Sequence, residues 1–443
     1  MSNGERCGVV EFAKNTEPTK GKEDSQMKER AAWKAGTLQD VIRSVRGGFS
    51  VRCEDRAAAT GELGVLKTGA VLVGKFDTKQ NKYVPPEEHA RLRTPVSANT
   101  IIICRKNSAE SIGASALVDR DYSHLFLSDL LWELKPSKDA DCHWLAHVLK
   151  SDFVLSILRL WSTGTQSTMK NISQDRLLAI PIRIPTKNEQ QDIVAILQTW
   201  DEAIELHDAL ALQLQKQDAA LIYQLVFGSL RIEPYSPSQK RKKYRWFDLP
   251  SDWRCERIGS LAREVSERNR EAEGAEILSC SKYDGFVRSL EYFKKQVFSS
   301  DLTGYKRIHR GDFGFPSNHV EEGSIGLQNL TDIGLVSPIY IVFRFSASKI
   351  DNEYAHYVLK TGLYRHIFEV STSASVDRRG SLRWDEFATI PFPVPSLQEQ
   401  REIVKVLHLS AKRLAALREE RSLLERQKRG LMQKLLTGEW RAN

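Results

Sequence analysis

Two acidic residues and a lysine have the spacing found in metal-dependent nucleases. Asp121 is followed by Glu133, and Lys135 comes two positions later, so that an acid precedes an E-x-K pattern. Carboxylate oxygens are suitable ligands for Mg²⁺, and a bound Mg²⁺ can support hydrolysis of a phosphodiester. Glu133 lies, however, in the strand-like run SDLLWELKP, where alternation of residue types explains it without any chemistry. A nuclease is therefore the alternative interpretation of this segment.

A second cluster contains residue types that bind metals. Cys142, His143 and His147 fall within the run CHWLAHVL. A helix that buries its aromatic side explains this run equally well, because apolar residues recur at helical spacing. The six cysteines of the chain are scattered and form no CxxC pair, which argues against a thiolate zinc site and against a disulfide framework. We therefore predict that the chain binds no metal itself.

The motifs of several enzyme classes are missing from the sequence. It contains no GxxxxGK[ST] phosphate loop, no Asn/Asp-Pro-Pro-aromatic segment of the adenine methyltransferase type and no glycine-rich cofactor turn. We therefore expect no catalytic centre and no directly bound cofactor. No apolar run approaches the roughly 18 residues that cross a bilayer, so we expect a cytoplasmic protein without a membrane partner.

The composition favours a globular protein with a polyanionic partner. The chain has 443 residues, of which 41% are hydrophobic, and its formal net charge is +8. This length suggests two to four domains at about 150 residues each. An excess of cations suits nucleic acid, because neutralising a phosphate releases condensed counterions.

The strongest signal is an internal repeat. The segment IPIRIPTKNEQQDIVAIL from Ile180 matches IPFPVPSLQEQREIVKVL from Ile390, and the match continues without a gap for some fifty residues. Each copy begins with a proline-rich segment that cannot be helical. A helix of about forty residues then begins near Glu189 or Glu399, and Gly228 or Gly438 ends it, because glycine readily adopts the left-handed closing conformation. We therefore predict two long, equivalent helices.

Each helix has apolar residues at alternating spacings of four and three, which is a heptad seam. A seam of this length requires a partner helix, and the economical partner is the other copy in the same chain. Two unrelated surface helices on separate cores are the alternative. His207, Asp218, Ser410, Arg421 and Lys428 interrupt the seam. Its apolar members include Ile193, Leu197, Ile204, Leu214, Leu221 and Leu225 in the first copy and Ile403, Leu407, Leu414, Leu424, Leu431 and Leu435 in the second.

Between the helices lie two stretches with strand-like runs bounded by glycine, each followed by a helical stretch. We predict an α+β fold with two lobes of equivalent topology, in which Trp33 and Trp253 are core anchors. Two predicted helical stretches cover Trp144–Leu160 and Asn352–Val370. The expected domains are a flexible extension (1–32), the first lobe (33–178), a helical region (179–232), a basic linker (233–247), the second lobe (248–388) and a second helical region (389–443).

This organisation resembles the specificity subunits of type I restriction–modification systems over essentially the whole chain after residue 32. The helix entries IPIRIPTKNEQQDIV and IPFPVPSLQEQREIV are similar to that family's conserved regions, and the lobes are similar to its target-recognition domains, as in GVLKTGAVLVGKFDTKQNKYVPP and YFKKQVFSSDLTGYKRIHRGDFGF. The resemblance implies that each lobe recognises one half of a bipartite DNA target. It also implies an antiparallel coiled coil with pseudo-two-fold symmetry. From the matched seams of the two copies we expect Leu214 to lie near Leu414 at the midpoint of such a pair.

The resemblance further implies partner subunits that carry the chemistry. Two modification subunits, which use S-adenosylmethionine to methylate adenine, would dock on the helical regions. Motor–nuclease subunits, which use ATP and Mg²⁺, would complete the restriction complex. A coiled-coil scaffold that binds no DNA is a second alternative, but it leaves the duplicated lobes with basic loops unexplained.

Candidate DNA contacts lie in basic, polar loops between the strand-like runs. Lysine and arginine are expected at phosphates, whereas arginine and asparagine also recognise base edges. The candidates in the first lobe are Lys75, Lys79, Asn81, Arg105, Lys106, Asn107, Gln166, Lys170 and Asn171. Those in the second lobe are Lys282, Tyr283, Ser317, Asn318, His319, Arg378 and Arg379, with His319 as a hydrogen-bonding loop residue and not a catalytic base.

Overall fold

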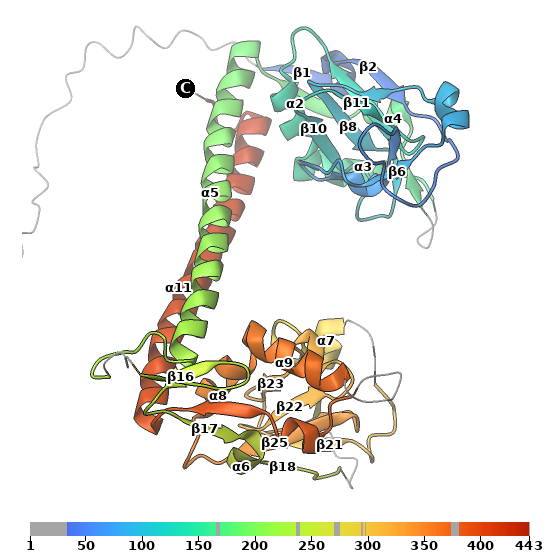
Figure 1. Cartoon of the computed structure of the whole chain (residues 1–443). Helices are drawn as coiled ribbons and strands as arrows, with labels where there is room; N and C mark the ends of the chain where they lie inside the picture. Colours follow the sequence, from blue (N-terminus) through green and yellow to red (C-terminus); the bar gives the residue numbers. More distant parts are fainter. Residues whose placement is uncertain are drawn as a thin grey trace, which may run out of the picture. The chain divides into compact units, whose positions relative to one another are not determined.

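The computed structural model describes residues 33–164, 169–235, 240–269, 275–293, 296, 298–373 and 381–442. The chain forms two compact units. The first comprises the residues up to Glu202 together with those from Glu425 onward, and the second comprises Ala203–Leu424. Each unit contains one α+β lobe and a part of each of two long helices (Figure 1). The predicted extension, residues 1–32, lies outside the described residues.

The lobe of the first unit contains two four-stranded sheets. Neighbouring strands are antiparallel except β11 and β3, which are parallel. One sheet has the order β10 (Ser115–Val118), β8 (Thr100–Cys104), β12 (Leu131–Pro136), β2 (Ile42–Gly47). The other has the order β6 (Asn81–Tyr83), β3 (Gly64–Leu66), β11 (Tyr122–Phe126), β7 (Pro95–Val96).

The lobe of the second unit repeats this plan. It again has two four-stranded sheets with a single parallel pair, β19 and β24. One sheet has the order β18 (Ala262–Glu264), β25 (Tyr340–Phe345), β22 (Phe313–Pro316), β23 (Gly326–Leu327). The other has the order β20 (Gly285–Arg288), β19 (Glu276–Ser281), β24 (Ile333–Val336), β21 (Lys306–His309). The predicted equivalence of the two lobes is therefore confirmed.

Shorter elements complete each unit. In the first unit they are β1 (Lys34–Thr37), α1 (Leu38–Val41), η1 (Thr68–Ala70), β4 (Val71–Leu72), β5 (Lys75–Phe76), η2 (Pro86–Arg91), β9 (Lys106–Asn107), β13 (Lys170–Asn171), α4 (Gln174–Leu178) and β14 (Pro181–Ile184). In the second they are β15 (Arg241–Lys243), β16 (Asp248–Pro250), β17 (Arg254–Arg257), α6 (Ile258–Leu261), α7 (Ser289–Phe293), η3 (Val320–Glu322), α10 (Trp384–Phe387) and β26 (Pro391–Val394).

Each predicted helical stretch after the sheets is in fact two helices. The first stretch divides into α2 (Cys142–Leu149) and α3 (Asp152–Trp161), and the second into α8 (Asn352–Leu359) and α9 (Gly362–Ser373). The break arises at a new N-cap: Ser151 Oγ accepts a hydrogen bond of 3.3 Å from the backbone N–H of Val154. Such a cap starts a new helix because it satisfies an otherwise unpaired N–H group. Both predicted helical stretches are therefore confirmed, each as two consecutive helices.

The proline-rich segments are extended, as predicted. β14 pairs antiparallel with β1, and β26 pairs antiparallel with β17. The long helices follow directly: α5 spans Lys187–Val226 and α11 spans Leu397–Thr437. Gly228 and Gly438, just beyond their ends, have φ of 64° and 76°. Both lie in the left-handed region that favours glycine, so the predicted ends of the helices are confirmed.

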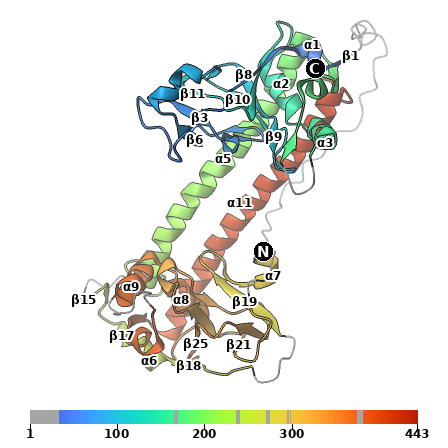
Figure 2. The same cartoon turned by 90° about the vertical axis from the view of Figure 1, so that its right-hand side faces the viewer.

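The two long helices pair antiparallel within each unit (Figure 2). In the second unit Arg421 Nη2 donates to Asp208 Oδ2 at 3.0 Å, and Ser410 donates to Asp218. These two pairs lie on opposite sides of Leu214 and Leu414, so the register places these leucines at the same level. All twelve predicted apolar seam residues are buried or half-buried. The seam prediction is therefore confirmed.

The polar interruptions of the seam face partners on the opposite helix. His207 Nε2 lies 3.6 Å from Glu420 Oε2, and Ser410 and Arg421 form the contacts described above. In the first unit Lys428 pairs with Asp201. An ion pair or hydrogen bond at a seam position favours one helix register, because a shifted register would separate these groups from their partners.

Each unit has its own core, and the predicted anchors lie in them. Trp33 packs in the core of the first unit with Trp144 and Leu177, and Trp253 packs in that of the second with Phe227 and Phe392. Within the ranges described above, no helix combines the length and apolarity that would let it cross a membrane.

Candidate nucleic-acid interface

The structure brings two predicted segments of the first lobe together. β9 pairs antiparallel with β13, which places Lys106 opposite Asn171 and Asn107 opposite Lys170. Lys170 Nζ also donates to the carbonyl of Gly164 at 2.7 Å. Gln166, a further predicted contact, lies outside the described residues. Cationic and amide side chains from two segments that are far apart in the sequence thus lie next to each other on one two-stranded ladder.

Two buried polar atoms lie at this ladder without a hydrogen-bond partner. They are Nε of Arg105 and Oδ1 of Asn171. The guanidinium of Arg105 stacks over Trp132, at 5.3 Å from the ring centroid. Buried polar groups normally find partners, because leaving one unpaired costs about 1–3 kcal/mol.

The other candidates of the first lobe lie around a hairpin. Lys75, in β5, and Lys79 are exposed. Asn81 is only 6% exposed, and its side chain donates to the carbonyl of Thr78 and accepts from the N–H of Ala58, both at 2.8 Å. Both ends of the amide are therefore occupied by backbone, which gives Asn81 a structural role in place of the predicted DNA contact.

In the second lobe, two predicted segments line one pocket. Lys282 and Tyr283 stand at the turn between β19 and β20, and the loop after β22 reaches the same place through Glu322 and Gly323. The pocket has a volume of about 250 Å³ and is completed by residues 359–362 and Arg365. The predicted Arg378 and Arg379 lie outside the described residues.

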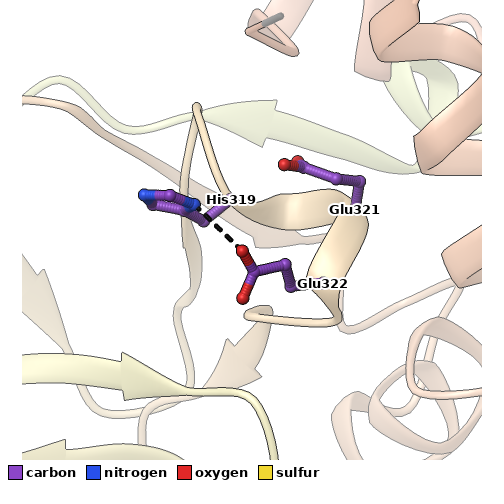
Figure 3. A group of neighbouring side chains, drawn as sticks. All are labelled: His319, Glu321 and Glu322. Carbon is purple, nitrogen blue, oxygen red and sulfur yellow. Dashed lines mark ion pairs between the residues drawn. The ribbon is translucent and has the colours of Figure 1, made fainter. Parts of the chain in front are cut away.

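The loop after β22 carries a compact polar cluster (Figure 3). His319 Nδ1 lies 3.3 Å from Glu322 Oε1, in agreement with a hydrogen-bonding role for the histidine. Asn318 Oδ1 and Glu321 Oε2 are buried atoms without a hydrogen-bond partner, whereas Ser317 is half-buried. An exposed ion pair accounts for the proximity of His319 and Glu322, so the cluster needs no metal ion to explain it.

Of the two acidic residues considered for metal chemistry, Asp121 has a backbone hydrogen-bond partner, whereas Oε1 of Glu133 is a buried atom without one. Asp121 Oδ1 accepts a hydrogen bond of 2.8 Å from the N–H of Ala98 and precedes β11. Glu133 is buried in β12, which belongs to the other sheet, and lies 3.6 Å from Lys135 Nζ. The two carboxylates thus belong to different sheets.

Cys142, His143 and His147 lie in α2, a helix that packs one side in the core of the first unit. Burial raises the pKa of the Cys142 thiol to about 12 and lowers the pKa of His147 to about 2. Trp144, in the same helix, is fully buried. A neutral thiol and a buried neutral imidazole agree with the predicted helix that buries its aromatic side.

One contact of the first unit joins residues that no sequence pattern connects. Glu189, near the start of α5, accepts a hydrogen bond of 3.3 Å from the indole of Trp33 and one of 3.0 Å from Arg441. Burial acts to raise the pKa of Glu189, but the hydrogen bonds from Arg441 and Thr186 outweigh it and lower that pKa. The carboxylate therefore ties the first lobe to both long helices.

The second unit contains the same arrangement. Glu399 accepts from the indole of Trp253 at 3.1 Å and from Arg231 at 2.7 and 2.9 Å. The signal was present in the repeat, because Arg231 and Arg441 occupy the same position of the two copies. We call each of these Trp–Glu–Arg groups a clasp.

Comparisons with known proteins agree with this duplicated architecture. The family model described as the type I restriction modification DNA specificity domain matches residues 32–216. The type I restriction enzyme EcoEI specificity subunit of Escherichia coli is 25% identical over 185 residues, which cover 41% of this chain but only 31% of that relative. A Methanocaldococcus jannaschii protein named as the specificity subunit of the type I restriction enzyme MjaX is 22% identical over 428 residues, or 92% of this chain and 94% of the relative.

A solved structure shows the shared fold. Its title describes complex assembly and conformational transition of the type I restriction–modification system, and its chain superimposes with a TM-score of 0.56 at 18% identity, over 92% of this chain and 98% of that one. The family model, the named relatives and the two equivalent lobes on paired helices agree. Residues 32–216 are thus similar to the type I restriction–modification DNA specificity domain, and most of the chain is similar to a protein named as a type I specificity subunit.

Proposed function

We propose that this chain is the DNA-recognising subunit of a type I restriction–modification complex and that each lobe recognises one half of a bipartite duplex target. Specificity subunits are the non-catalytic component of such systems. The observation that carries the proposal is the duplication: two lobes share one strand order but differ in their exposed polar residues. One scaffold with two different sets of side chains suits the recognition of two different half-sites. We assign these roles to residues 33–178 and 248–388.

We infer that the exposed and half-buried lysines hold DNA phosphates and that the amides contact base edges. Lys75, Lys79, Lys106 and Lys170 supply positive charge in the first lobe, and Asn107 and Asn171 supply donors and acceptors beside them. Such a division is typical of specific DNA binding, because phosphate contacts orient the protein and base contacts carry the sequence information. Lys282, Tyr283, Ser317, Asn318 and His319 are the corresponding group of the second lobe, and Gln166, Arg378 and Arg379 remain part of the proposal.

The paired helices are proposed to serve two purposes. Their length would set the number of base pairs between the half-sites, which a flexible linker could not fix. Their outer faces would bind two modification subunits, and this is supported by exposed leucines in the second unit, among them Leu206, Leu212 and Leu409. S-adenosylmethionine would then be held by the modification subunits, and ATP and Mg²⁺ by the motor–nuclease subunits. We propose a cytoplasmic location, since these partners act on cellular DNA.

The decisive experiment combines the chain with its modification subunit and maps methylated adenines in cellular DNA. We expect one bipartite motif. Exchange of residues 33–178 for the lobe of another family member should change one half of that motif and leave the other half intact. A scaffold protein would produce no motif and would show no salt-dependent binding to duplex DNA. Changes in both halves would contradict the assignment of one lobe to each half-site.

A further inference from the structure

The two lobes present hairpin tips at the same structural position. In the first unit the segment between β3 and β6 contains the short hairpin of β4 and β5. Gly74, in the turn of this hairpin, donates its backbone N–H to the carbonyl of Ser115 in β10 at 2.8 Å. In the second unit the turn between β19 and β20 packs on β23, where a Cβ on Gly326 would lie 3.2 Å from Gly285 Cα. β10 and β23 are themselves equivalent edge strands. The two tips therefore correspond, although their sequences differ.

An equivalent lysine supports each tip. Lys360, which closes α8, donates to the carbonyl of Lys282 at 2.8 Å and to that of Gly323 at 3.1 Å. Lys150 closes α2 in the first unit, and its side chain lies against the other tip, because a Cβ on Gly74 would meet its Cδ at 3.4 Å. Both lysines are half-buried. Each fold thus holds its tip in place with a charged side chain from the same helix end.

The tips carry exposed apolar side chains in basic surroundings. Tyr283 is 80% exposed, and Leu72 and Val73 are 53% and 46% exposed. Lys282 and Arg365 flank Tyr283 at its pocket, and Lys75 comes two positions after Val73. Adjacent exposed apolar side chains, such as Leu72 and Val73, form a contiguous surface of the kind found at binding sites, and neighbouring cations indicate that the partner is an anion. DNA offers both features, since bases carry apolar faces and methyl groups between rows of phosphates.

We infer that the two hairpin tips are the elements that contact bases in the two half-sites, with Leu72 and Val73 acting in the first lobe and Tyr283 in the second. This inference rests on the proposed function. Leu72 and Val73 suit the methyl group of thymine, which is the one apolar group on a base edge in the major groove. The ring of Tyr283 packs against a base, while Lys282 and Arg365 hold the adjacent phosphates. Lys150 and Lys360 are positioning residues.

The test measures binding and methylation by the complex with its modification subunit on a duplex that carries the mapped motif. Each thymine of the motif is replaced in turn by uracil, which lacks the methyl group. We expect about fourfold weaker binding at one or more positions of the first half-site, on the order of the free energy of one buried methylene. The double variant Leu72→Ser/Val73→Ser should bind thymine and uracil equally at these positions. The second half-site should be unaffected.

The second lobe is tested with Tyr283→Ala and Tyr283→Phe. Tyr283→Ala should relax base preference at one position of the second half-site, whereas Tyr283→Phe keeps the ring and should retain the preference. Leu160→Ala, which shortens an equally exposed side chain on α3, is the control and should leave both half-sites unchanged. Thermal unfolding confirms that each variant is folded, which is expected because the altered side chains are exposed.

The outcomes separate this inference from the proposed function. If the wild-type complex yields no bipartite motif, the proposed function fails. If the motif appears but no uracil substitution distinguishes the wild type from the Leu72→Ser/Val73→Ser variant, the inference about the first tip is overturned. An unchanged second half-site in Tyr283→Ala would overturn the inference about the second tip.

Discussion

The indole Nε1 of Trp253 donates a hydrogen bond of 3.1 Å to Oε2 of Glu399, although the two residues are 146 positions apart. Trp253 opens the second lobe and Glu399 opens α11. Arg231, which follows α5, completes the group by binding both carboxylate oxygens. A single carboxylate therefore joins the lobe, the start of one long helix and the end of the other. The clasp of the first unit uses Trp33, Glu189 and Arg441 in the same way.

Replacement of the two clasp carboxylates should have unequal effects. Arg231 is only 5% exposed, so Glu399→Gln leaves a buried guanidinium without its main counter-ion. We expect a loss of roughly 3 kcal/mol in the free energy of unfolding of the second unit, as for a broken buried ion pair. Arg441 and Glu189 are more exposed, so Glu189→Gln should cost only about 1 kcal/mol in the first unit.

Hydrogen-exchange mass spectrometry with urea unfolding tests this difference, because it reports the two units separately. Each variant is the control for the other. Equal losses in both units for either variant would show that the clasps do not act locally.

The stability of the first unit should depend on pH through His147. Burial is the main cause that lowers its pKa from 6.5 to about 2, and Lys150, Lys428 and His143 act in the same direction. The unfolded imidazole binds a proton below pH 6.5, whereas the folded one stays neutral until about pH 2. The unfolded state thus binds more protons in this window, so the stability present above pH 6.5 decreases as the pH falls.

His147→Leu replaces the titrating imidazole by an apolar side chain of similar size. We expect the decrease in free energy of unfolding between pH 6.5 and 4.5 to be smaller in this variant. Urea unfolding monitored at several pH values provides the measurement. An identical pH dependence in the variant and the wild type would exclude His147 as its source.

Much of the architecture could be predicted because its signals are local. The heptad seam and the closing glycines Gly228 and Gly438 depend on spacing along one helix, which sequence displays directly. The clasps could not be predicted from such patterns, since they join residues brought together only by the fold. Asn81 shows the opposite error: it stands among lysines in a polar run, but the turn folds it inward onto Thr78 and Ala58. The polar composition of this loop could be predicted from the sequence. Which of its side chains face solvent could not, because that depends on the hydrogen bonds that form on folding.

Two adjacent residues of the β9–β13 ladder should affect DNA binding differently. Lys106→Ala should weaken binding to all sequences alike and reduce the slope of log K against log salt by about 0.9, as expected for one lost phosphate contact. Asn107→Ala should keep the slope and relax base preference at one position of the first half-site. Filter binding at several salt concentrations measures the slope, and a library of half-site variants measures the preference. A changed slope in Asn107→Ala with unchanged preference would reverse the two roles.

The first unit contains a cavity next to Thr437, whereas a phenylalanine ring occupies the equivalent position in the second unit. The cavity has a volume of about 420 Å³ and is lined by Thr437, Met432, Val154 and Ile182, among others. At the repeat position of Thr437 the second unit has Phe227, which is buried, with its ring centroid 5.2 Å from that of Phe247 and 6.5 Å from that of Tyr364. Since the two units share one plan, Thr437→Phe should place a ring in the cavity.

This ring would bury apolar surface that is now open, so we expect Thr437→Phe to raise the free energy of unfolding of the first unit by about 1–2 kcal/mol. Thr437→Ala, which shortens the side chain, is the control and should give no gain. Hydrogen exchange should show the increased protection at the end of α11 and in α3, and none in the second unit. If the variant is less stable than the wild type, the cavity cannot accept a phenylalanine ring. The packing around Thr437 would then differ from the packing around Phe227, although the two units share one strand order.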